Sequence, residues 1–217
     1  GEPSLLGSIG IAYSDRLHRL HPGRRQTVAV IGQQAESLLA SRALQAEADR
    51  ASRQTIEVLV RALELHDEYT AGHSDWVSVY TRLLGHALAW SPYRVERAGH
   101  AGLLHDIGKV RMDPKVINHN GPLSDEQRRE FQQHTIAGRD MLLPLESMAD
   151  VIPAVYGHHE RWVGGGYPVG LEACELPALA RATCIADAYD AMTSHRAYRR
   201  ARPHDAALRE LRRCKEI

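Results

Sequence analysis

The feature that most constrains this chain is the pair His105-Asp106, which ends an apolar helical run and precedes Ile107, Gly108 and Lys109. Consecutive helical side chains point about 100° apart, so this imidazole and carboxylate can bind one cation only from a buried helix end where other ligands converge. Gly108 allows the helix to end there. A carboxylate with an imidazole suits a borderline divalent cation such as Fe, Mn, Zn or Ni better than Ca or Mg. Lys109 would supply positive charge for an anion beside the metal.

Composition bounds the class of protein. The 217 residues are 43% hydrophobic and 25% charged with a formal net charge of zero, which indicates one large globular domain, or one domain with an appendage, and gives no basic excess for DNA. No apolar run approaches the roughly 18 residues of a membrane span, and residues 1–30 lack a signal-peptide pattern, so we expect a cytoplasmic location. The cysteines are odd in number and lack C-x-x-C spacing, whereas histidines number 13, which turns the metal question toward nitrogen and oxygen ligands.

The first part of the chain predicts a strand and then a long helix. Residues 8–13 alternate like a short strand, and a helical pattern begins after Pro22-Gly23. This order resembles the C-terminal edge of a GAF-type sensor domain running into a signalling helix, so we expect a strand and turn remnant over 1–25 and a linker helix over 26–63. A coiled-coil seam spaced 3, 4, 3 predicts that this helix forms a homodimer; it consists of Val28, Ile31, Ala35 and Leu38.

Helices with identifiable starts follow from Thr70 onward. Ser91-Pro92 has the form of an N-cap with proline at the first helical position, and Ser124 with Gln127 predicts a capping box. Asp150 is predicted to cap the helix that leads into two consecutive histidines. Apolar stripes at helical spacing place seven metal-binding side chains on inward faces or ends of five helices. These are His73, His105, Asp106, His134, His158, His159 and Asp187.

The number of these side chains favours a metal centre. A single inward histidine is most often a hydrogen-bonded core residue. Burying seven uncompensated polar or charged groups would cost several kcal/mol each, however, and a cluster of divalent cations would compensate them together. The other histidines are interpreted as surface or incidental residues; they are His18, His21, His66, His86, His100, His119, His195 and His204.

Five motifs in order, between about residue 64 and residue 207, resemble the HD-GYP family of the HD-domain phosphohydrolases. They are Tyr69-Thr70-Ala71-Gly72-His73-Ser74, LLHDIGK at 103–109, His134 with Gly138, HHERWVGGGYP at 158–168 and IADAYDAMTSHRAYR at 185–199. The resemblance implies an all-α helical bundle over 64–217, preceded by the linker helix and the strand remnant. It implies hydrolysis of cyclic di-GMP to pGpG or onward to GMP, and diguanylate cyclases as partner proteins.

The resemblance also implies residue roles. The family's metal ligands fall on the seven side chains named above, with Asp106 bridging two divalent transition-metal ions, Fe or Mn. Asp106 and Lys109 would be catalytic, and a hydroxide bridging the metals would attack in line with the leaving ribose oxygen. Tyr167, Asp190, Arg196 and Arg199 match positions that hold substrate. The alternatives are that Tyr167 only packs in a glycine-rich turn and that the two arginines belong to a solvated basic helix end.

Departures from the family's pattern qualify this interpretation. Tyr69 stands where some members carry a glutamate that binds a third metal, so a two-metal site is expected. Val163 replaces the usual aspartate of the glycine-rich loop, and the segment that usually closes the domain does not follow Ile217. We therefore expect a fragment or a lost closing helix. Two alternative functions stay open: a catalytically weak cyclic di-GMP sensor or interaction module, and a generic HD nucleotide phosphohydrolase.

Overall fold

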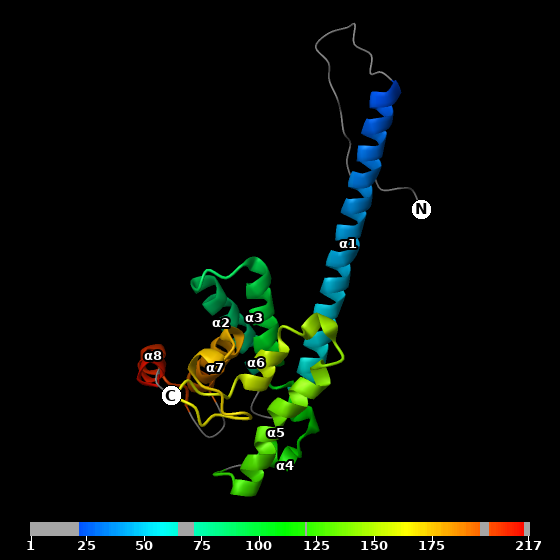
Figure 1. The fold of residues 1–217 in the computed structure, drawn as a ribbon. Coiled ribbons are helices and arrows are strands. Elements are labelled where there is room, and N and C mark those ends of the chain that lie inside the picture. The colour runs from blue at the N-terminus through cyan, green and yellow to red at the C-terminus, as the bar shows by residue number, and fades with distance from the viewer. Residues whose placement is uncertain (1–21, 65–71, 120, 196–199, 215–217) are drawn as a thin grey trace. The chain divides into compact units, whose positions relative to one another are not determined.

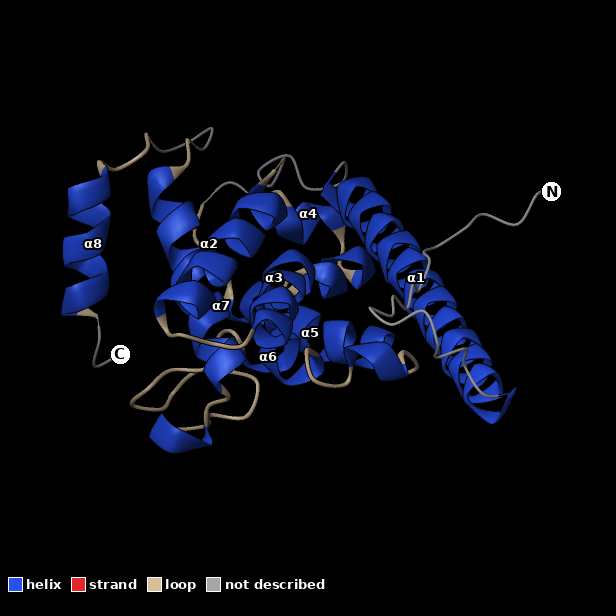
Figure 2. Cartoon of the chain, turned by 90° about the horizontal axis from the view of Figure 1, so that it is seen from above, coloured by secondary structure: helices blue, strands red, loops and turns tan. Residues whose placement is uncertain are grey.

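A computed structural model describes residues 22–64, 72–119, 121–195 and 200–214 (Figure 1). Within these ranges every regular element is a helix, as Figure 2 shows, so the predicted all-α fold is confirmed. The predicted strand over residues 8–13 and the remnant over 1–25 lie largely or wholly outside the described residues, and the resemblance to a GAF-type domain stays a prediction. Among the described helices, none combines the length and apolarity that crossing a membrane requires.

The chain divides into two units, residues 1–56 and residues 57–217. Helix α1 (Pro22–Glu64) is continuous and covers the predicted linker helix. In the part of α1 that belongs to the first unit, most large apolar side chains are exposed. Ile31 and Leu38 of the predicted seam are 54% and 56% exposed, and Val28 and Ala35 are partly buried. The predicted domain boundary at residues 63 and 64 stays a prediction.

The second unit is a bundle of helices joined by turns and by a longer loop, residues 158–172, between α6 and η3. Its longer helices are α2 (His73–Ala87), α3 (Pro92–Leu104), α5 (Asp125–Leu142), α6 (Ile152–Gly157), α7 (Ala178–Thr193) and α8 (His204–Arg213). Its shorter elements are η1 (Ile107–Arg111), α4 (Pro114–Ile117), η2 (Glu146–Met148) and η3 (Ala173–Glu175). Helices α2, α3 and α7 pack against one another, α6 contacts α3, α5 and α7, and η1 packs against α5. Segments far apart in the sequence therefore meet where α3, α5, α6 and α7 converge.

Local sequence signals explain how two of these helices begin. The Ser91 hydroxyl accepts a hydrogen bond from the Arg94 amide, and Pro92 occupies the first turn of α3, as predicted. The capping box at the start of α5 is confirmed as well, because Ser124 and Gln127 each bind the other's amide through a side chain. Each cap satisfies a helical amide that would otherwise lack a partner.

The predicted cap at Asp150 is wrong. Helix α6 starts after Val151 without a side-chain cap, and Asp150 instead accepts hydrogen bonds from Arg97, at 2.6 Å from Nη2, and from the Tyr93 hydroxyl at 3.0 Å. A buried guanidinium is a stronger partner for a carboxylate than a peptide amide is, because the guanidinium carries a positive charge and the amide is neutral. The Asp150 carboxylate therefore ties the segment before α6 to α3.

The core of the bundle is built from small and branched side chains. On α3 the sequence spacing predicts an inward face of Val95, Ala98, Gly102 and His105. This face is confirmed, because all four residues are buried. On α2 the sequence spacing predicts an inward stripe of His73, Val77, Tyr80, Leu84 and Leu88. The stripe ends before Leu88, which is 58% exposed at the C-cap. The interpretation of His100 as a surface or incidental residue is wrong about its position, since it is buried and its Nδ1 lies 3.0 Å from Arg97 Nη1.

Candidate metal centre

The structure brings all seven predicted metal ligands into one region of the bundle. His73 opens α2, His105 and Asp106 follow α3, and His134 lies within α5. His158 and His159 follow α6, and Asp187 lies within α7. His105, His134 and His158 are at most 1% exposed, while the Asp187 side chain is 21% exposed. Most of the ligand atoms are therefore buried, and the carboxylate of α7 lies nearer the surface.

Asp106 lies between two groups of possible ligands. One group is His73, His105 and Asp106, and the other is Asp106, His134, His158 and His159; within each, the ligand atoms lie within 4.8 Å of one another. Asp106 Oδ2 is 3.3 Å from His105 Nε2, whereas Oδ1 is 3.4 Å from His134 Nε2 and 4.0 Å from His158 Nε2. Each carboxylate oxygen thus faces a different group, which is the placement a bridging ligand requires.

Asp187 extends the first group. Its Oδ1 lies 3.2 Å from His73 Nε2 and 4.0 Å from His105 Nε2. A cation between these atoms would have two imidazole nitrogens and oxygens from two carboxylates around it, a donor set suited to a borderline transition metal.

Three imidazoles are oriented by their own helices. In each, Nδ1 lies within hydrogen-bond distance of the carbonyl oxygen three residues earlier, as in His105 with Gly102 at 2.8 Å, His134 with Phe131 at 2.6 Å and His158 with Val155 at 2.8 Å. Because a carbonyl only accepts, Nδ1 must donate, which leaves the lone pair on Nε2. Among the described residues, the buried Nε2 of His105 finds no hydrogen-bond partner. An unsatisfied, inward-pointing lone pair of this kind fits a metal ligand.

His73 is oriented differently, by a carboxylate from another helix. Its Nδ1 lies 2.7 Å from Oδ2 of Asp190, which is 2% exposed and also accepts a hydrogen bond from the Ser194 hydroxyl at 3.0 Å. A carboxylate behind a ligating histidine fixes the ring and raises its basicity. Both oxygens of Asp190 are thus engaged within the protein, and its predicted contact with substrate stays a prediction.

The pKa of His73 is shifted in the opposite direction from the pKa values of His134, His158 and His159. Burial and neighbouring imidazoles lower the pKa of His158 and His159, the latter to about 4, and burial also lowers the pKa of His134. Burial acts in the same direction on His73, but hydrogen bonds to Asp187 and Asp190 outweigh it and raise its pKa to about 9.

The carboxylates of the centre are ionised. Burial opposes the charge of Asp106, but Lys109 and His105 together hold its pKa well below the usual range. For Asp187, burial is likewise outweighed by the hydrogen bond to His73 and by nearby imidazoles, so its pKa also lies below the usual range. The anionic oxygen of Asp106 beside the neutral imidazoles of His134, His158 and His159 forms a set that a divalent cation can complete.

Lys109 lies beside the shared carboxylate. Its Nζ is 2.7 Å from Asp106 Oδ2 and the residue is 9% exposed. A carboxylate oxygen has lone pairs for more than one partner, so this ion pair is compatible with a metal at the same oxygen. The ammonium group is placed at the edge of the centre, and its predicted role near the scissile phosphate stays a prediction.

Tyr167 reaches the centre from the glycine-rich loop, residues 161–172, which precedes η3. Its ring stacks on His159 with centroids 4.7 Å apart and an interplanar angle of 28°. Burial raises the pKa of its hydroxyl far above the usual range, so the phenol is neutral. Two other predicted substrate residues, Arg196 and Arg199, lie outside the described residues, as does Tyr69 at the third-metal position.

Two contacts around the centre were missed by the sequence prediction. One is the pairing of Asp190 with His73 described above. The other is Glu160, which is 4% exposed and accepts hydrogen bonds from the amides of the glycine-rich loop. The signal that could have found Glu160 is an acidic residue directly after the histidine pair and before that loop. Val163, at the position of the family's aspartate, is 57% exposed.

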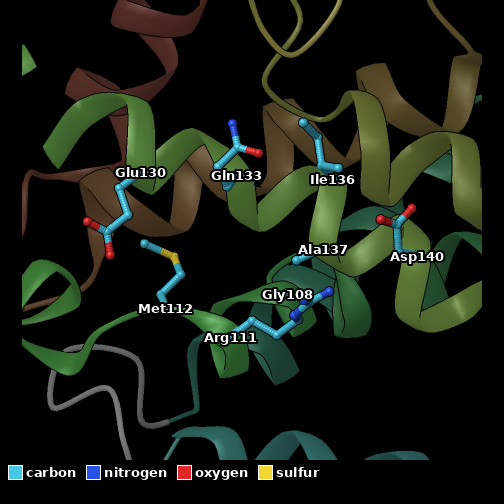
Figure 3. A pocket seen from close by; sticks show the side chains of 8 residues that line it. All are labelled: Gly108, Arg111, Met112, Glu130, Gln133, Ile136, Ala137 and Asp140. Carbon is cyan, nitrogen blue, oxygen red and sulfur yellow. The ribbon is translucent and has the colours of Figure 1, made fainter. Parts of the chain in front are cut away.

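A cavity of about 330 Å³ lies elsewhere, over η1 and α5 (Figure 3). Its lining contains none of the seven candidate ligands; it consists of Gly108, Arg111, Met112, Glu130, Gln133, Ile136, Ala137 and Asp140. The candidate metal centre is thus defined by its ligands and not by this cavity.

Comparison with known families decides the class of protein. Residues 57–216 match the HD domain family. The chain belongs to the HD domain family. The predicted resemblance to HD-domain phosphohydrolases is therefore confirmed, and the helical fold of the second unit is the HD fold.

Curated relatives of this HD domain protein are cyclic dinucleotide phosphodiesterases. It is 38% identical over 154 residues to cyclic di-GMP phosphodiesterase PA4108 of Pseudomonas aeruginosa, covering 70% of this chain and 37% of the relative. It is 34% identical over 148 residues to 3'3'-cGAMP-specific phosphodiesterase 3 of Vibrio cholerae, covering 68% and 32%. The chain thus spans about a third of the length of these two relatives.

Solved structures share the helical fold. Bd1817, an HDG"Y"P protein from Bdellovibrio bacteriovorus, matches with a TM-score of 0.53 and 24% identity over 67% of this chain and 46% of that chain. A cyclic GMP-AMP specific phosphodiesterase of V. cholerae, V-cGAP3, matches with a TM-score of 0.56 and 17% identity over 74% and 44%. At these identities the likeness concerns the fold alone.

Proposed function

We propose that this chain is a metal-dependent phosphodiesterase that hydrolyses cyclic di-GMP to pGpG or onward to GMP. The observation that carries the proposal is the placement of Asp106, whose oxygens face two different groups of buried imidazoles. Neither a sensor module nor a purely structural core requires such a set. The relatives named as cyclic di-GMP phosphodiesterases support the choice of substrate.

The residues fit two divalent cations. Asp106 and Asp187 with His73 and His105 would hold one, and Asp106 with the three remaining histidines would hold the other. When bound, two such cations, expected to be Fe or Mn, supply Lewis acidity for a phosphoryl oxygen and acidify a water molecule. Asp106 would be a ligand of both sites.

The remaining side chains would bind the substrate. The Lys109 ammonium group, beside Asp106, offers positive charge to a phosphate oxygen. The Tyr167 ring provides a flat surface on which a guanine base can stack, next to His159. Arg196 and Arg199 are proposed to neutralise the phosphate groups. Each phosphodiester bond consumes one water molecule, so the first hydrolysis gives pGpG and the second gives GMP.

A second candidate substrate is 3′3′-cGAMP, which relatives in V. cholerae are named for. Anaerobically purified protein should be incubated with each cyclic dinucleotide and the products separated by chromatography. Linear product from cyclic di-GMP at the faster rate supports the proposal. Faster turnover of 3′3′-cGAMP would select the second candidate, and no turnover of either by protein with two metal equivalents would refute both.

Substitution of Arg196 separates this function from a generic HD phosphohydrolase. A nitrophenyl phosphodiester needs only the metal centre, whereas a cyclic dinucleotide also needs contacts for its second phosphate. Arg196→Ala should lower kcat/KM for cyclic di-GMP about ten- to a hundredfold, the worth of one charge-assisted contact, and affect the nitrophenyl ester far less. Equal losses with both substrates would assign Arg196 to the fold or the metal site, and no loss with either would favour the generic enzyme.

We also propose that α1 forms a parallel homodimer through residues 26–63. Val30, Ile31, Leu38, Leu39 and Leu44 are between 46% and 67% exposed, which leaves apolar area for a partner helix. Light scattering of the full chain should give the mass of a dimer, and of a monomer after Ile31→Glu and Leu38→Glu. A monomeric full chain at high concentration would refute the dimer. Diguanylate cyclases are the proposed heterologous partners, to be tested by co-purification.

A further inference from the structure

Glu160 directly follows the last histidine of the candidate centre, but its carboxylate is directed to the glycine-rich loop. Oε1 accepts hydrogen bonds from the amides of Val169 at 2.7 Å and Gly170 at 3.0 Å. Oε2 accepts from Gly170 at 3.0 Å and Leu171 at 3.0 Å. The residue is 4% exposed. Three consecutive backbone amides thus converge on one buried carboxylate, which satisfies a charge that would otherwise be costly to bury.

The loop folds back onto the residues around Glu160. Gly164 and Gly165 have φ angles of 82° and 72°, which a side chain would strain. Gly166 lies so close to the chain that a Cβ atom there would be 2.5 Å from Glu160 Cα. The Tyr167 amide then donates to the His159 carbonyl at 3.3 Å. The chain up to Tyr167 is therefore held against residues 159 and 160 by backbone contacts. The chain after Tyr167 is held by the Glu160 carboxylate.

We propose that Glu160 is a positioning residue that fixes the glycine-rich loop and thereby sets the place of the Tyr167 ring over His159. The proposal rests on the proposed function, because the purpose of that placement is to present the ring to a base of the cyclic dinucleotide. Glu160 itself does not touch substrate. Its contribution reaches the reaction through one ring, so it should concern recognition of the dinucleotide and not hydrolysis of a phosphodiester as such.

Glu160→Gln is the informative substitution, because it keeps the size of the side chain but replaces one accepting oxygen by an amide nitrogen that must face backbone N–H groups. We expect kcat/KM for cyclic di-GMP to fall about ten- to a hundredfold, mainly through KM. Metal content and the rate with a nitrophenyl phosphodiester should stay at the wild-type level. Glu175→Gln is the matched control, since that exposed carboxylate accepts a single amide at 3.1 Å, and it should behave as wild type.

A double-mutant cycle separates positioning from general support of the fold. If Glu160 acts through Tyr167, Glu160→Gln should cause no further loss in a Tyr167→Ala background. Additive losses would overturn the proposal. Loss of metal, or equal losses with both substrates in the single variant, would show that Glu160 supports the centre and would also overturn it, as would unchanged kinetics.

Amide hydrogen exchange tests the same contact without turnover. In Glu160→Gln the amides of residues 169–171 should exchange at least tenfold faster than in wild type, while the amides of α5 keep their rates. Wild-type exchange at residues 169–171 would overturn the proposal. This measurement holds even if no cyclic dinucleotide is hydrolysed, so failure of the proposed function and failure of the loop contact are distinguished.

Discussion

The two sides of the candidate metal centre satisfy their histidines in different ways. On the side of α2 and α7, His73 lies between two carboxylates, Asp187 and Asp190, and we call these three residues the carboxylate side. On the side of α5 and α6, which we call the imidazole side, three rings gather around the shared Asp106, and no second carboxylate of the described residues belongs to their group. These rings are His134, His158 and His159.

This difference teaches how the two sides behave toward a cation. On the carboxylate side an imidazolium with a pKa of about 9 is already paired with anions, so a metal binding there must displace a proton. On the imidazole side burial keeps the rings neutral, with a pKa of about 4 for His159, and their lone pairs can accept a cation directly. On the carboxylate side the imidazole is therefore already hydrogen-bonded to anions without metal, whereas on the imidazole side the described residues offer no such anion to each of the neutral rings.

Removal of the shared carboxylate should have the largest effect. Asp106→Ala removes the oxygens that face both sides, so metal content should fall from two equivalents to fewer than one and hydrolysis of cyclic di-GMP should be abolished. Elemental analysis and product chromatography measure both. Asp140→Ala is the control, because that carboxylate is 41% exposed and pairs with Arg139. A variant at residue 106 that keeps metal and activity would make Asp106 a structural residue.

Asp190→Asn should weaken the carboxylate side alone. Loss of the partner behind a ligating histidine costs about 10- to 100-fold in metal affinity or activity. We expect one metal equivalent to be lost first in a chelator titration while the second is retained, with little change in KM. Full metal occupancy together with a raised KM would instead support the predicted contact of Asp190 with substrate.

Removal of metal should lower the stability of the folded protein by a moderate amount. A site held at a free metal concentration of 100 times its Kd stabilises the folded state by about 2.7 kcal/mol, which corresponds to a melting temperature higher by roughly 5–10 °C for a chain of this size. Chelation of wild type should therefore lower the melting temperature, and the fall should be smaller in Asp190→Asn. An equal fall in both proteins would contradict independent contributions from the two sides.

We expect the smallest effect on stability from the pair Arg97–Asp150. In contrast to the candidate metal centre, this pair needs no metal cation. Burial opposes the charge of Asp150, but hydrogen bonds from Arg97 and Tyr93 outweigh burial and lower its pKa. A lowered pKa in the folded state adds stability above the unfolded value of about 3.9 and loses it as pH falls through the folded value. Because the carboxylate is 40% exposed, we expect only about 1 kcal/mol.

Chemical denaturation of wild type and Asp150→Asn at several pH values checks this expectation. The difference in free energy of unfolding should be present at pH 7 and shrink progressively below about pH 4. Metal content should be the same in both proteins. A difference in the free energy of unfolding that grows toward low pH would contradict a lowered pKa of Asp150 in the folded state.

Much of this candidate centre was predictable because its candidate ligands lie on periodic helices or at their ends. His134 and Asp187 each share a face with apolar residues, and His105 ends such a face, so spacing alone pointed them inward. The local caps at Ser91 and Ser124 were predictable for the same reason, since cap and amide are three residues apart.

What the sequence did not reveal are pairings between distant segments. Asp190 and His73 are 117 residues apart, and no spacing rule connects them. Asp150 has the form of a local cap, but Arg97, 53 residues earlier, binds it in the folded chain. The Glu160 contacts depend on a loop that turns back through glycines with positive φ. In all three cases, tertiary contact decided among partners that local sequence left open.

Gly108 sets a dimension of the centre. A Cβ atom there would collide with the carbonyl of His134 and lie 2.5 Å from the Gly138 amide nitrogen, so the turn carrying Asp106 rests on the main chain of the helix carrying His134. A spacing between two main chains cannot relax by a change of rotamer. Exchanging neighbouring side chains would therefore leave the spacing between the Asp106 turn and the helix that carries His134 unchanged. A designer who wants this fold to accept an ion of larger radius would have to alter that backbone contact before altering any ligand.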